Sequence, residues 1–364
     1  MIYSATDHAA MARALELAER GLFSTTPNPR VGCVIVRDGR TVGEGWHERA
    51  GTPHAEIVAL QRAGAAAQGA TAYVTLEPCS HFGRTPPCAD ALIDAGIERV
   101  VAAMEDPNPL VSGRGLARLR ANGIRTESGL MREAATELNP GFISRMTRGR
   151  PWLRLKSAAS LDGKVALRNG LSQWITGAEA RVDGHRWRAR ACAILTGIGT
   201  VLKDDPALTV RGITCERQPL RVLVDTRLDI PESARLLHGG NCLVVCAEPR
   251  PASAGRLEAL GVEVLCMPTR NGSVDLVALM HELARRGCNE LHVEGGPRLN
   301  GALLQTGLAD ELLIYLAPRL IGDLAQGMFS VPELTDLGQA ISLSILDVRT
   351  VGRDLRVIAR PTGG

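Results

Sequence analysis

A set of potential metal ligands in the first third of the chain constrains this sequence more than any other feature. His54 is followed two residues later by Glu56, and then by Cys79 and Cys88. One imidazole and two thiolates are ligands that Zn²⁺ prefers, and three protein ligands leave the fourth tetrahedral position for water. A carboxylate beside such a water can carry protons to and from it. The pattern predicts a catalytic zinc site, with His54, Cys79 and Cys88 as metal ligands and Glu56 as the acid and base.

The spacing of the two cysteines limits the classes of zinc protein to which the chain can belong. Zinc deaminases of nucleobases carry H-x-E followed by P-C-x-x-C, whereas eight residues separate Cys79 from Cys88 here. A structural zinc knuckle, or a histidine that only packs in a core, is the alternative. Three features favour catalysis. The motif offers three good ligands and not four, a glutamate stands two residues after the histidine, and Cys79 follows a predicted strand almost directly.

Length and composition exclude several classes of protein. The chain has 364 residues, which is enough for two domains, and 45% of them are hydrophobic. A net charge of +3 and an aromatic content of 3% argue against a nucleic-acid partner. No apolar run is long enough to span a bilayer, and the N-terminus lacks the basic and apolar regions of a signal peptide. We therefore expect a soluble protein that binds small molecules, without nucleic-acid or membrane partners.

The cysteines indicate a reducing compartment. There are nine of them, an odd number, and they are scattered along the chain. Cys192, Cys242, Cys246 and Cys266 lie in apolar runs, where a reduced thiol packed in the core is expected. Such a pattern is not a disulfide framework. We expect a cytoplasmic protein, and a homo-oligomer remains possible.

Strand and helix patterns alternate along the chain, which is typical of an α/β fold. The first helix is expected over residues 7–21, with Asp7 capping its start and Gly21 ending it. Asn139 and the following proline are expected to end the helices of a first domain. The polar stretch after them contains glycine and proline, as domain linkers do. The expected organisation is a first domain, a linker and a second domain over 1–146, 147–151 and 152–364.

Two glycine-rich turns stand out in the second half. Gly295 and Gly296 follow a predicted strand and precede a predicted helix, and Gly197 and Gly199 follow another strand. Backbone N–H groups in such turns can approach an anion closely. Either turn alone is weak evidence, because a tight strand-to-helix turn needs no ligand. Two such turns at strand ends favour a nucleotide crevice.

The first half resembles the deaminase half of the bifunctional deaminase/reductase family of riboflavin biosynthesis. The resemblance covers residues 1 to about 146 and rests on T-P-N-P-R-V-G at 26–32, His47, P-H-A-E at 53–56, E-P-C-S-H-F-G-R-T-P-P-C at 77–88 and D-P-N-P at 106–109. It implies a cytidine-deaminase-like α/β/α sandwich. It also implies the substrate 2,5-diamino-6-(5-phosphoribosylamino)pyrimidin-4-one, which loses its C2 amino group as ammonia.

The same resemblance implies roles for three further residues. Asn28 would hydrogen-bond the pyrimidine, because an amide offers both a donor and an acceptor. His81 and Arg84, between the two cysteines, would reach the ring edge or the 5′-phosphate of the substrate. The alternative for His81 and Arg84 is a solvated loop without a ligand.

The second half resembles the reductase half of the same family. The resemblance rests on L-K-S-A-A-S-L-D-G-K at 155–164, S-Q-W-I-T at 172–176, L-K-D-D-P-A-L-T-V-R at 202–211 and V-E-G-G-P at 293–297. It implies a dihydrofolate-reductase-like α/β domain that uses NADPH. The implied reaction reduces the ribosylamino C1′, as its ring-opened imine, to the ribitylamino product, with hydride from the nicotinamide.

Matching positions imply two sets of binding residues in this half. Those that would bind NADP are Ala158, Trp174, Thr200, Asp204, Thr226, Gly296, Pro297, Arg298, Leu299, Asn300, Gly301 and Ala302. Those that would bind the substrate are Ser172, Arg188, Leu208, Arg211 and Glu294. The two arginines suit the substrate phosphate, whereas the role of Lys156 is open. Core packing is the alternative for Trp174 and Leu208, and a solvated helix charge for Arg188.

Three other functions compete with this interpretation. One is a nucleic-acid base deaminase with an accessory domain, against which the charge, the few aromatics and the long spacing between the cysteines argue. Another is a zinc-stabilised binding module without catalytic activity. The third is a working deaminase fused to an inactive reductase.

Overall fold

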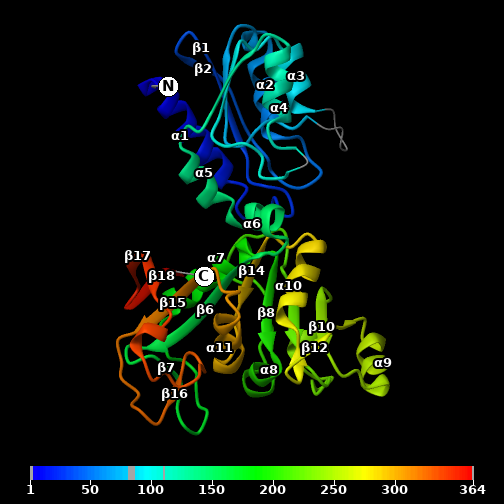
Figure 1. Ribbon diagram of the computed structural model, residues 1–364, viewed down its shortest axis with the longest axis vertical. Helices are drawn as coiled ribbons and strands as arrows, with labels where there is room; N and C mark the ends of the chain where they lie inside the picture. Colours follow the sequence, from blue (N-terminus) through cyan, green and yellow to red (C-terminus); the bar gives the residue numbers. More distant parts are fainter. Residues whose placement is uncertain (1–2, 81–86, 110, 363–364) are drawn as a thin grey trace. The chain divides into compact units, whose positions relative to one another are not determined.

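The computed structural model of the chain describes residues 3–80, 87–109 and 111–362. It divides into two compact units, Met1–Gly149 and Arg150–Gly364, each of which has its own sheet and its own cores (Figure 1).

The first unit is built on a sheet of five strands in the order β2-β1-β3-β4-β5. β1 pairs antiparallel with β2 and β3, while β3, β4 and β5 are parallel. The tight turn between β1 and β2 has Asp38 and Gly39 at positive φ, as a two-residue hairpin requires. The strands are β1 (Gly32–Arg37), β2 (Arg40–Trp46), β3 (Thr71–Val74), β4 (Arg99–Ala102) and β5 (Arg125–Ser128).

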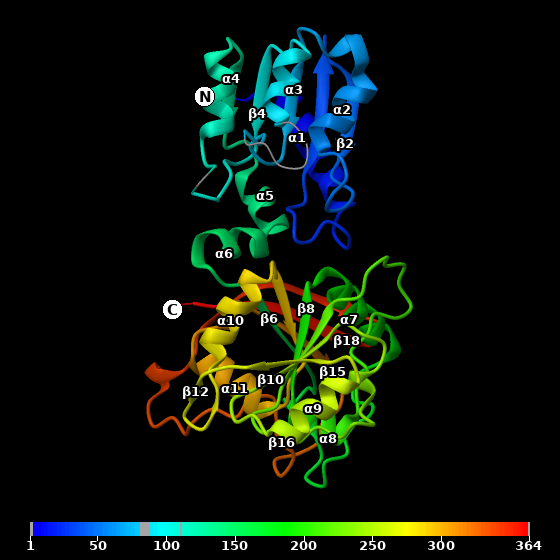
Figure 2. The ribbon, with the colours of Figure 1, turned by 90° about the vertical axis from the view of Figure 1, so that its right-hand side faces the viewer.

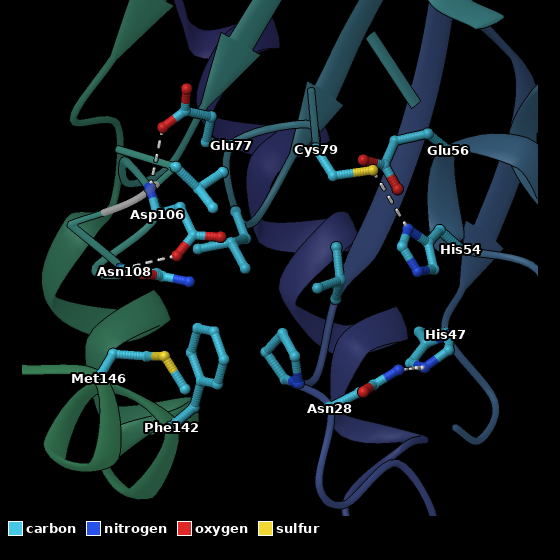
Figure 3. A pocket seen from close by; sticks show the side chains of 14 residues that line it. Asn28, His47, His54, Glu56, Glu77, Cys79, Asp106, Asn108, Phe142 and Met146 are labelled. Carbon is cyan, nitrogen blue, oxygen red and sulfur yellow. Dashed lines mark hydrogen bonds between the residues drawn. The ribbon is translucent and has the colours of Figure 1, made fainter. Parts of the chain in front are cut away.

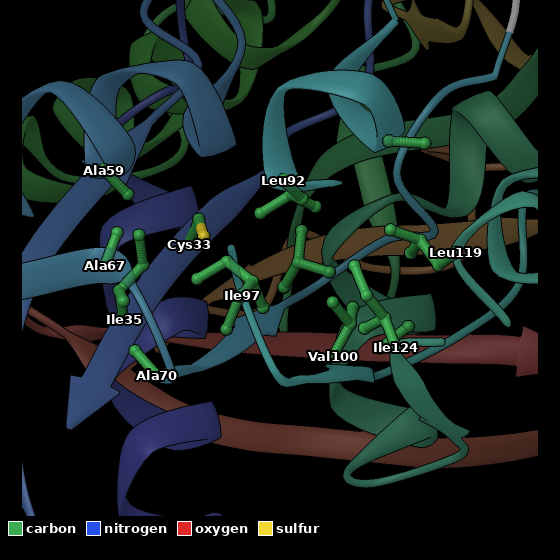
Figure 4. Close-up of a cluster of buried hydrophobic side chains, with 14 of the residues drawn as sticks. Cys33, Ile35, Ala59, Ala67, Ala70, Leu92, Ile97, Val100, Leu119 and Ile124 are labelled. Carbon is green, nitrogen blue, oxygen red and sulfur yellow. The ribbon is translucent and has the colours of Figure 1, made fainter. Parts of the chain in front are cut away.

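Helices cover both faces of this sheet, because its strands alternate side chains between two cores. On one face, α2, α3 and α4 pack on Cys33, Ile35 and Val100 (Figure 4). On the other, α1 and α5 pack on Val34 and Val101. The helices are α1 (Ala5–Glu19), α2 (Ala55–Ala63), α3 (Cys88–Asp94), α4 (Arg114–Ala121), α5 (Arg132–Leu138) and α6 (Pro140–Arg148), with a 3₁₀ turn, η1 (Gly64–Ala67).

The first helix begins earlier than predicted, and its cap is a different residue. Ser4 is the N-cap, and its hydroxyl accepts the N–H of Asp7 at 3.1 Å. The Asp7 carboxylate accepts the N–H of Ser4 in return, at 2.8 Å, which completes a capping box. The Asp7 carboxylate also accepts hydrogen bonds from the Tyr73 hydroxyl, at 2.7 Å, and from Nη1 of Arg99, at 2.6 Å. Its predicted role as the cap was wrong because the carboxylate is needed inside the first turn.

A second correction concerns the predicted end of the helices in the first domain. Pro140 does not end the helices but begins α6, where proline is tolerated because the first turn lacks N–H partners anyway. The helix continues through Thr147 and Arg148, two residues of the predicted linker, and it ends at Gly149 with φ 65°.

The second unit has a sheet of nine strands in the order β11-β10-β9-β8-β14-β6-β15-β18-β17. The strands from β11 to β15 run parallel, and β18 and β17 close the edge antiparallel. The strands are β6 (Trp152–Ser160), β8 (Ala193–Gly197), β9 (Leu220–Val224), β10 (Cys242–Cys246), β11 (Glu263–Cys266), β14 (Glu290–Val293), β15 (Glu311–Ala317), β17 (Leu343–Val351) and β18 (Asp354–Pro361). Two small sheets pair β7 (Lys164–Ala166) with β16 (Gln326–Gly327) and β12 (Thr269–Arg270) with β13 (Ser273–Val274).

Helices lie on both faces of this sheet as well (Figure 2). α10 and α11 share one core with the parallel strands, and α8 and α9 share another. The helices are α7 (Ala178–Arg190), α8 (Ile198–Asp204), α9 (Pro251–Ala259), α10 (Leu276–Arg285) and α11 (Pro297–Gln305), with 3₁₀ turns η2 (Arg235–Leu237) and η3 (Leu337–Gln339). Because the central strands are parallel, their carboxyl ends, and the turns that follow, share one edge.

The burial of the cysteines confirms the predicted core positions only in part. All nine cysteines are unbridged, and Cys242 and Cys246 are buried, as expected. Cys192 is half-buried and Cys266 is exposed, so the prediction of a core position for Cys266 was wrong. Cys266 lies on β11, the edge strand of the sheet, where neighbours cover less of each side chain. Among the described residues, no helix has the length and apolar character needed to cross a membrane.

Because α11 lies close to the backbone of the segment before β17, a methyl group added to α11 at Gly301 should lower the stability of the second unit. A Cβ on Gly301 would stand 1.9 Å from the backbone oxygen of Ser330. Gly301→Ala should therefore destabilise the second unit by about 2 kcal/mol, which lowers its melting temperature by about 4–8 °C in calorimetry. Gly184→Ala in α7 is the control, because its Cβ would have no described atom within 4 Å. That variant should gain up to about 1 kcal/mol. Equal effects of the two variants would contradict the packing described here.

Candidate active sites

Three potential metal ligands converge at one edge of the first unit. His54 is the N-cap of α2, Cys88 is the first residue of α3, and Cys79 lies between β3 and α3. The Nδ1 atom of His54 lies 3.2 Å from Cys88 Sγ and 3.7 Å from Cys79 Sγ. All three ligand atoms lie within 4.8 Å of one another. Figure 3 shows His54 and Cys79 facing each other, with Glu56 beside them.

This donor set fits Zn²⁺. Zinc–sulfur and zinc–nitrogen bonds of about 2.3 and 2.0 Å place tetrahedral ligand atoms roughly 3.6 Å apart, close to the separations seen here. One nitrogen and two sulfurs are the soft and borderline donors that zinc selects. Among the described residues, no other group of histidine, cysteine or carboxylate side chains gathers in this way.

The surroundings of the cluster favour a thiolate and a protonatable glutamate. Hydrogen bonding from Cys88 lowers the pKa of Cys79 to about 4, with further help from His54. The N–H of Cys88, at the start of α3, donates to Cys79 Sγ at 3.2 Å. Burial raises the pKa of Glu56 to about 7, and the neighbouring Cys79 adds to the effect. At neutral pH, Glu56 is therefore poised both to accept and to release a proton.

A cavity of about 270 Å³ opens beside these residues. Asn28 and His47 line it, and their side chains are hydrogen-bonded, Nδ2 to Nε2, at 3.0 Å. Nδ1 of His47 lies 3.2 Å from the carbonyl oxygen of Pro53, so it carries the proton and Nε2 accepts. Asn28 then donates one N–H to His47. Its amide oxygen remains as an acceptor for a ligand. Burial lowers the pKa of His47, which keeps the ring neutral at pH 7.

Glu77 is part of the sequence motif, and the structure shows what it contacts. Its carboxylate accepts four backbone N–H groups, at 2.8 to 3.1 Å, from the turn before α4 and from the first turn of that helix. The donors are Asp106, Gly113, Gly115 and Leu116. A carboxylate is favoured at a helix N-terminus. Glu77 therefore fastens the chain just before Cys79 to α4.

The sequence analysis missed the contribution of α6 to the cavity, and it named two residues that lie outside the described part of the chain. Phe142 and Met146 of α6 line the cavity. Their spacing of four residues puts them on one helix face, which was the available signal. The predicted end of the helices at Asn139 left no helix there to carry that signal. His81 and Arg84 lie outside the described residues.

In the second unit, the two glycine-rich turns lie against each other. A Cβ on Gly296 would stand 3.6 Å from Thr200 Oγ1, and one on Gly199 would stand 3.6 Å from the Arg298 guanidinium. Likewise, a Cβ on Gly197 would stand 3.6 Å from Leu299. The predicted cofactor residues at the carboxyl ends of β8 and β14 are thus brought together. Pro297, Asn300, Gly301 and Ala302 follow in the first turns of α11.

The remaining predicted cofactor residues occupy different places around this edge. Asp204 ends α8, and its carboxylate accepts the hydroxyl of Ser172 at 3.1 Å. Trp174 is 63% exposed, so the core alternative for it is wrong. The Arg181 guanidinium lies 4.7 Å from the centre of its ring. Ala158 lies on β6. Thr226 follows β9, and its carbonyl accepts N–H groups from the segment after β10.

An ionic cluster forms around Glu294 at the end of β14. The Glu294 carboxylate accepts a hydrogen bond from Nη2 of Arg188 at 2.9 Å. Nζ of Lys156 lies 3.8 Å from the same carboxylate. Arg188 also donates to the carbonyl of Thr209, at 3.0 Å, so it is not a solvated helix charge. These cations hold the pKa of Glu294 well below its usual range despite burial. Glu294 therefore stays ionised at neutral pH.

The structure adds His185 to this cluster, a residue that the sequence analysis missed. Its Nδ1 accepts the backbone N–H of Arg211 at 3.2 Å. Burial and the two nearby arginines, Arg188 and Arg211, lower the pKa of His185 to about 4. The signal was its position three residues before Arg188 on a helix. Leu208 is buried in the core, 2% exposed, as the core-packing alternative expects, and its φ is 49°.

Comparison with known proteins assigns a class to each half of the chain. Residues 4–104 match the family model described as the cytidine and deoxycytidylate deaminase zinc-binding region, and residues 151–357 match the RibD C-terminal domain. Fold and site therefore define a zinc-dependent deaminase joined to a reductase domain. The chain belongs to the RibD family of riboflavin-biosynthesis proteins.

The relatives match nearly the whole chain. The riboflavin biosynthesis protein RibD of Escherichia coli is 49% identical over 361 residues, which are 96% of this chain and 98% of that protein. A solved structure of RibD from Acinetobacter baumannii is 44% identical, with a TM-score of 0.92 over 98% of this chain and 99% of that one. A Thermotoga maritima structure, described as a diaminohydroxyphosphoribosylaminopyrimidine deaminase/5-amino-6-(5-phosphoribosylamino)uracil reductase, is 34% identical with a TM-score of 0.86, covering 98% of this chain and 99% of that one.

These matches confirm three predictions. The family is the predicted one. The fold is a cytidine-deaminase-like α/β/α sandwich followed by a dihydrofolate-reductase-like α/β domain. The protein is an enzyme of riboflavin biosynthesis with a deaminase half and a reductase half. The individual site residues remain predictions.

The four hydrogen bonds to Glu77 predict that its replacement costs stability. Glu77→Gln places an amide NH₂ group among backbone donors, so at least one N–H loses its acceptor. The first unit should lose about 1–3 kcal/mol of unfolding free energy in urea titrations. Glu98→Gln is the control, because the Glu98 side chain is 62% exposed and pairs with a surface arginine. It should change stability by less than about 0.5 kcal/mol. An equally small change for Glu77→Gln would contradict its role as an anchor.

Proposed function

We propose that the chain catalyses two successive reactions on one phosphorylated pyrimidine. The first removes the C2 amino group of 2,5-diamino-6-(5-phosphoribosylamino)pyrimidin-4-one as ammonia. The second uses NADPH to reduce the ribosyl side chain of the product to ribityl phosphate. The observation that carries this proposal is the cluster of His54, Cys79 and Cys88, with buried Glu56 beside a cavity, in a chain that matches RibD over nearly its full length.

In the deaminase half, His54 Nδ1 and the thiolates of Cys79 and Cys88 would hold the metal. Zinc bound by three protein ligands lowers the pKa of a water ligand to about 7, which makes a nucleophile available at neutral pH. The residues of the chain then have to orient the pyrimidine and move protons. No other described histidine, cysteine or carboxylate cluster competes for this metal.

Glu56 would move the protons of the deamination. Addition of water to C2 and departure of ammonia require both protons of the water to be moved, one to a ring nitrogen and the other to the departing amine. A carboxyl group with a pKa of about 7 can accept and return a proton with little cost at either step. Asn28, with its amide oxygen available, would accept a hydrogen bond from an N–H of the pyrimidine. His81 and Arg84 remain predicted contacts of the substrate.

In the reductase half, the paired glycine turns would hold the pyrophosphate of NADPH. Gly296, Arg298 and Leu299 would offer backbone N–H groups, and Thr200 a hydroxyl, to the phosphates, while Pro297 and the residues from Asn300 to Ala302 would line the same site. Asp204, Ala158, Trp174 and Thr226 would line the rest of the cofactor. The hydride comes from the nicotinamide, so the protein has to orient the two reactants.

The ionic cluster around Glu294 would bind the substrate of the reduction. Arg211 is exposed beside His185 and suits the dianionic phosphate. Arg188 holds Glu294 in place, so its contribution to phosphate binding would come through its remaining donors. Ser172 would complete the site, and Leu208 remains a predicted contact of the substrate. Lys156 lies within the cluster, and its role is open.

We place the deaminase in the unit Met1–Gly149 and the reductase in the unit Arg150–Gly364, and we assign the protein to the cytoplasm. Nine unbridged cysteines support a reducing compartment. A small-molecule substrate follows from the family. A homo-oligomer remains a possibility that size measurements in solution can test.

Replacing Glu56 should abolish the first reaction alone. Glu56→Gln keeps the three metal ligands but removes the proton carrier, so ammonia release should fall by a factor of about 10²–10⁴. Zinc content should stay at the wild-type level. NADPH oxidation should also be retained when the deaminated substrate is supplied. Glu19→Gln, an exposed residue of α1, is the control and should behave as wild type. Full ammonia release by Glu56→Gln would refute the assignment.

Replacing Arg211 should weaken substrate binding in the second reaction. Arg211→Gln removes a cation from the proposed phosphate site, so KM for the deaminated substrate should rise about tenfold, with a smaller change in kcat. Arg186→Gln, an exposed arginine of α7, is the control and should leave KM unchanged. A KM for Arg211→Gln equal to that of the control would rule out this phosphate site. Ammonia release without any NADPH oxidation by wild type would indicate an inactive reductase.

A further inference from the structure

The direction in which NADPH lies across the sheet follows from the proposed function. The strands run in the order β10-β9-β8-β14-β6. The paired glycine turns follow β8 and β14, while Glu294 and Lys156, near the proposed substrate, belong to β14 and β6. The nicotinamide must face the substrate, so it points toward β6. The adenosine half must then extend the other way, over the carboxyl ends of β9 and β10.

A rigid loop follows β9 at this place. Buried Asp225 accepts the N–H of Ile230 at 2.8 Å, which closes the loop on itself. Leu228 and Ile230 point into the core below, 4% and 7% exposed. Arg227 and Asp229 alternate with these two residues along the chain, and both are exposed. The inward residues therefore fix where the outward charges stand.

A second loop, which follows β10, brings another arginine to the carboxylate of Asp229. The carbonyl of Thr226 accepts the N–H groups of Ala247 and Glu248, at 3.1 and 3.0 Å, which joins the two loops. Arg250 follows as the N-cap of α9. Its Nη1 lies 3.4 Å from one carboxylate oxygen of Asp229, and Nε of Arg227 lies 3.4 Å from the other.

We propose that Arg227 and Arg250 bind the 2′-phosphate of NADPH and make the reductase select NADPH over NADH. Two guanidinium groups around one carboxylate leave an excess of positive charge. A phosphate dianion has oxygens enough to accept from both. The side chains of Arg227 and Arg250 are 61% and 58% exposed, so their ion pairs with Asp229 are weak and easily exchanged. NADH carries a neutral ribose hydroxyl there, which offers these arginines no negative charge.

Binding of two nucleotides to the full-length protein tests this proposal without relying on activity. Adenosine 2′,5′-bisphosphate and adenosine 5′-monophosphate differ only in the 2′-phosphate. In calorimetric titrations, Arg227→Gln and Arg250→Gln should each weaken binding of the bisphosphate about tenfold and change binding of the monophosphate less than about twofold. Asp229→Asn should strengthen binding of the bisphosphate, because it removes the competing carboxylate.

Controls separate the possible failures. Arg285→Gln changes an arginine of α10 that is 74% exposed and pairs with Glu282, and it should change neither affinity. The ratio of kcat/KM for NADPH to that for NADH should fall about tenfold in Arg227→Gln and Arg250→Gln, with the NADH value unchanged. If wild type binds the bisphosphate and the two variants bind it equally well, this inference is wrong. If wild type binds neither the bisphosphate nor NADPH, the proposed reductase itself fails.

Discussion

The first unit depends on bringing the Cys88 thiol next to the His54 imidazole, 34 residues earlier in the chain. Three elements end or begin at one edge of the sheet to do so: β3 ends before Cys79, and α2 and α3 begin at His54 and Cys88. Free N–H groups at a helix start favour a thiolate. Glu77 ties the same edge to α4. The proposed zinc ligands are therefore held by backbone that is itself hydrogen-bonded, which would keep the site in shape.

The two halves solve related problems with different means. Both place their chemistry where strands end and helices begin. In the deaminase half, burial and the neighbouring Cys79 raise the pKa of Glu56, so it can exchange a proton at neutral pH. In the reductase half, Arg188 and Lys156 surround buried Glu294 and keep it charged. One carboxylate is suited to carry protons, and the other to hold cations around a phosphorylated substrate.

Much of the candidate site was readable from the sequence, because spacing and residue type carry the chemistry. Order and spacing alone predict that His54, Cys79 and Cys88 bind zinc and that Glu56 is the acid. The glycine turns predict a nucleotide crevice. The predicted ends of the helices were less accurate. Ser4 and not Asp7 caps α1, and Pro140 begins α6, because capping depends on hydrogen bonds that many polar residues can make.

By itself, the sequence determined the fold class, the two-domain order and the chemistry of the zinc cluster, because these follow from local patterns of ligands and hydrophobic residues. Only the tertiary structure decided which distant groups meet. Phe142 reaches the deaminase cavity, His185 joins Arg211, and Asp229 gathers Arg227 and Arg250. Such pairings depend on the order of strands in a sheet. That order is set by how the whole chain buries its apolar faces, and no short stretch of sequence records it.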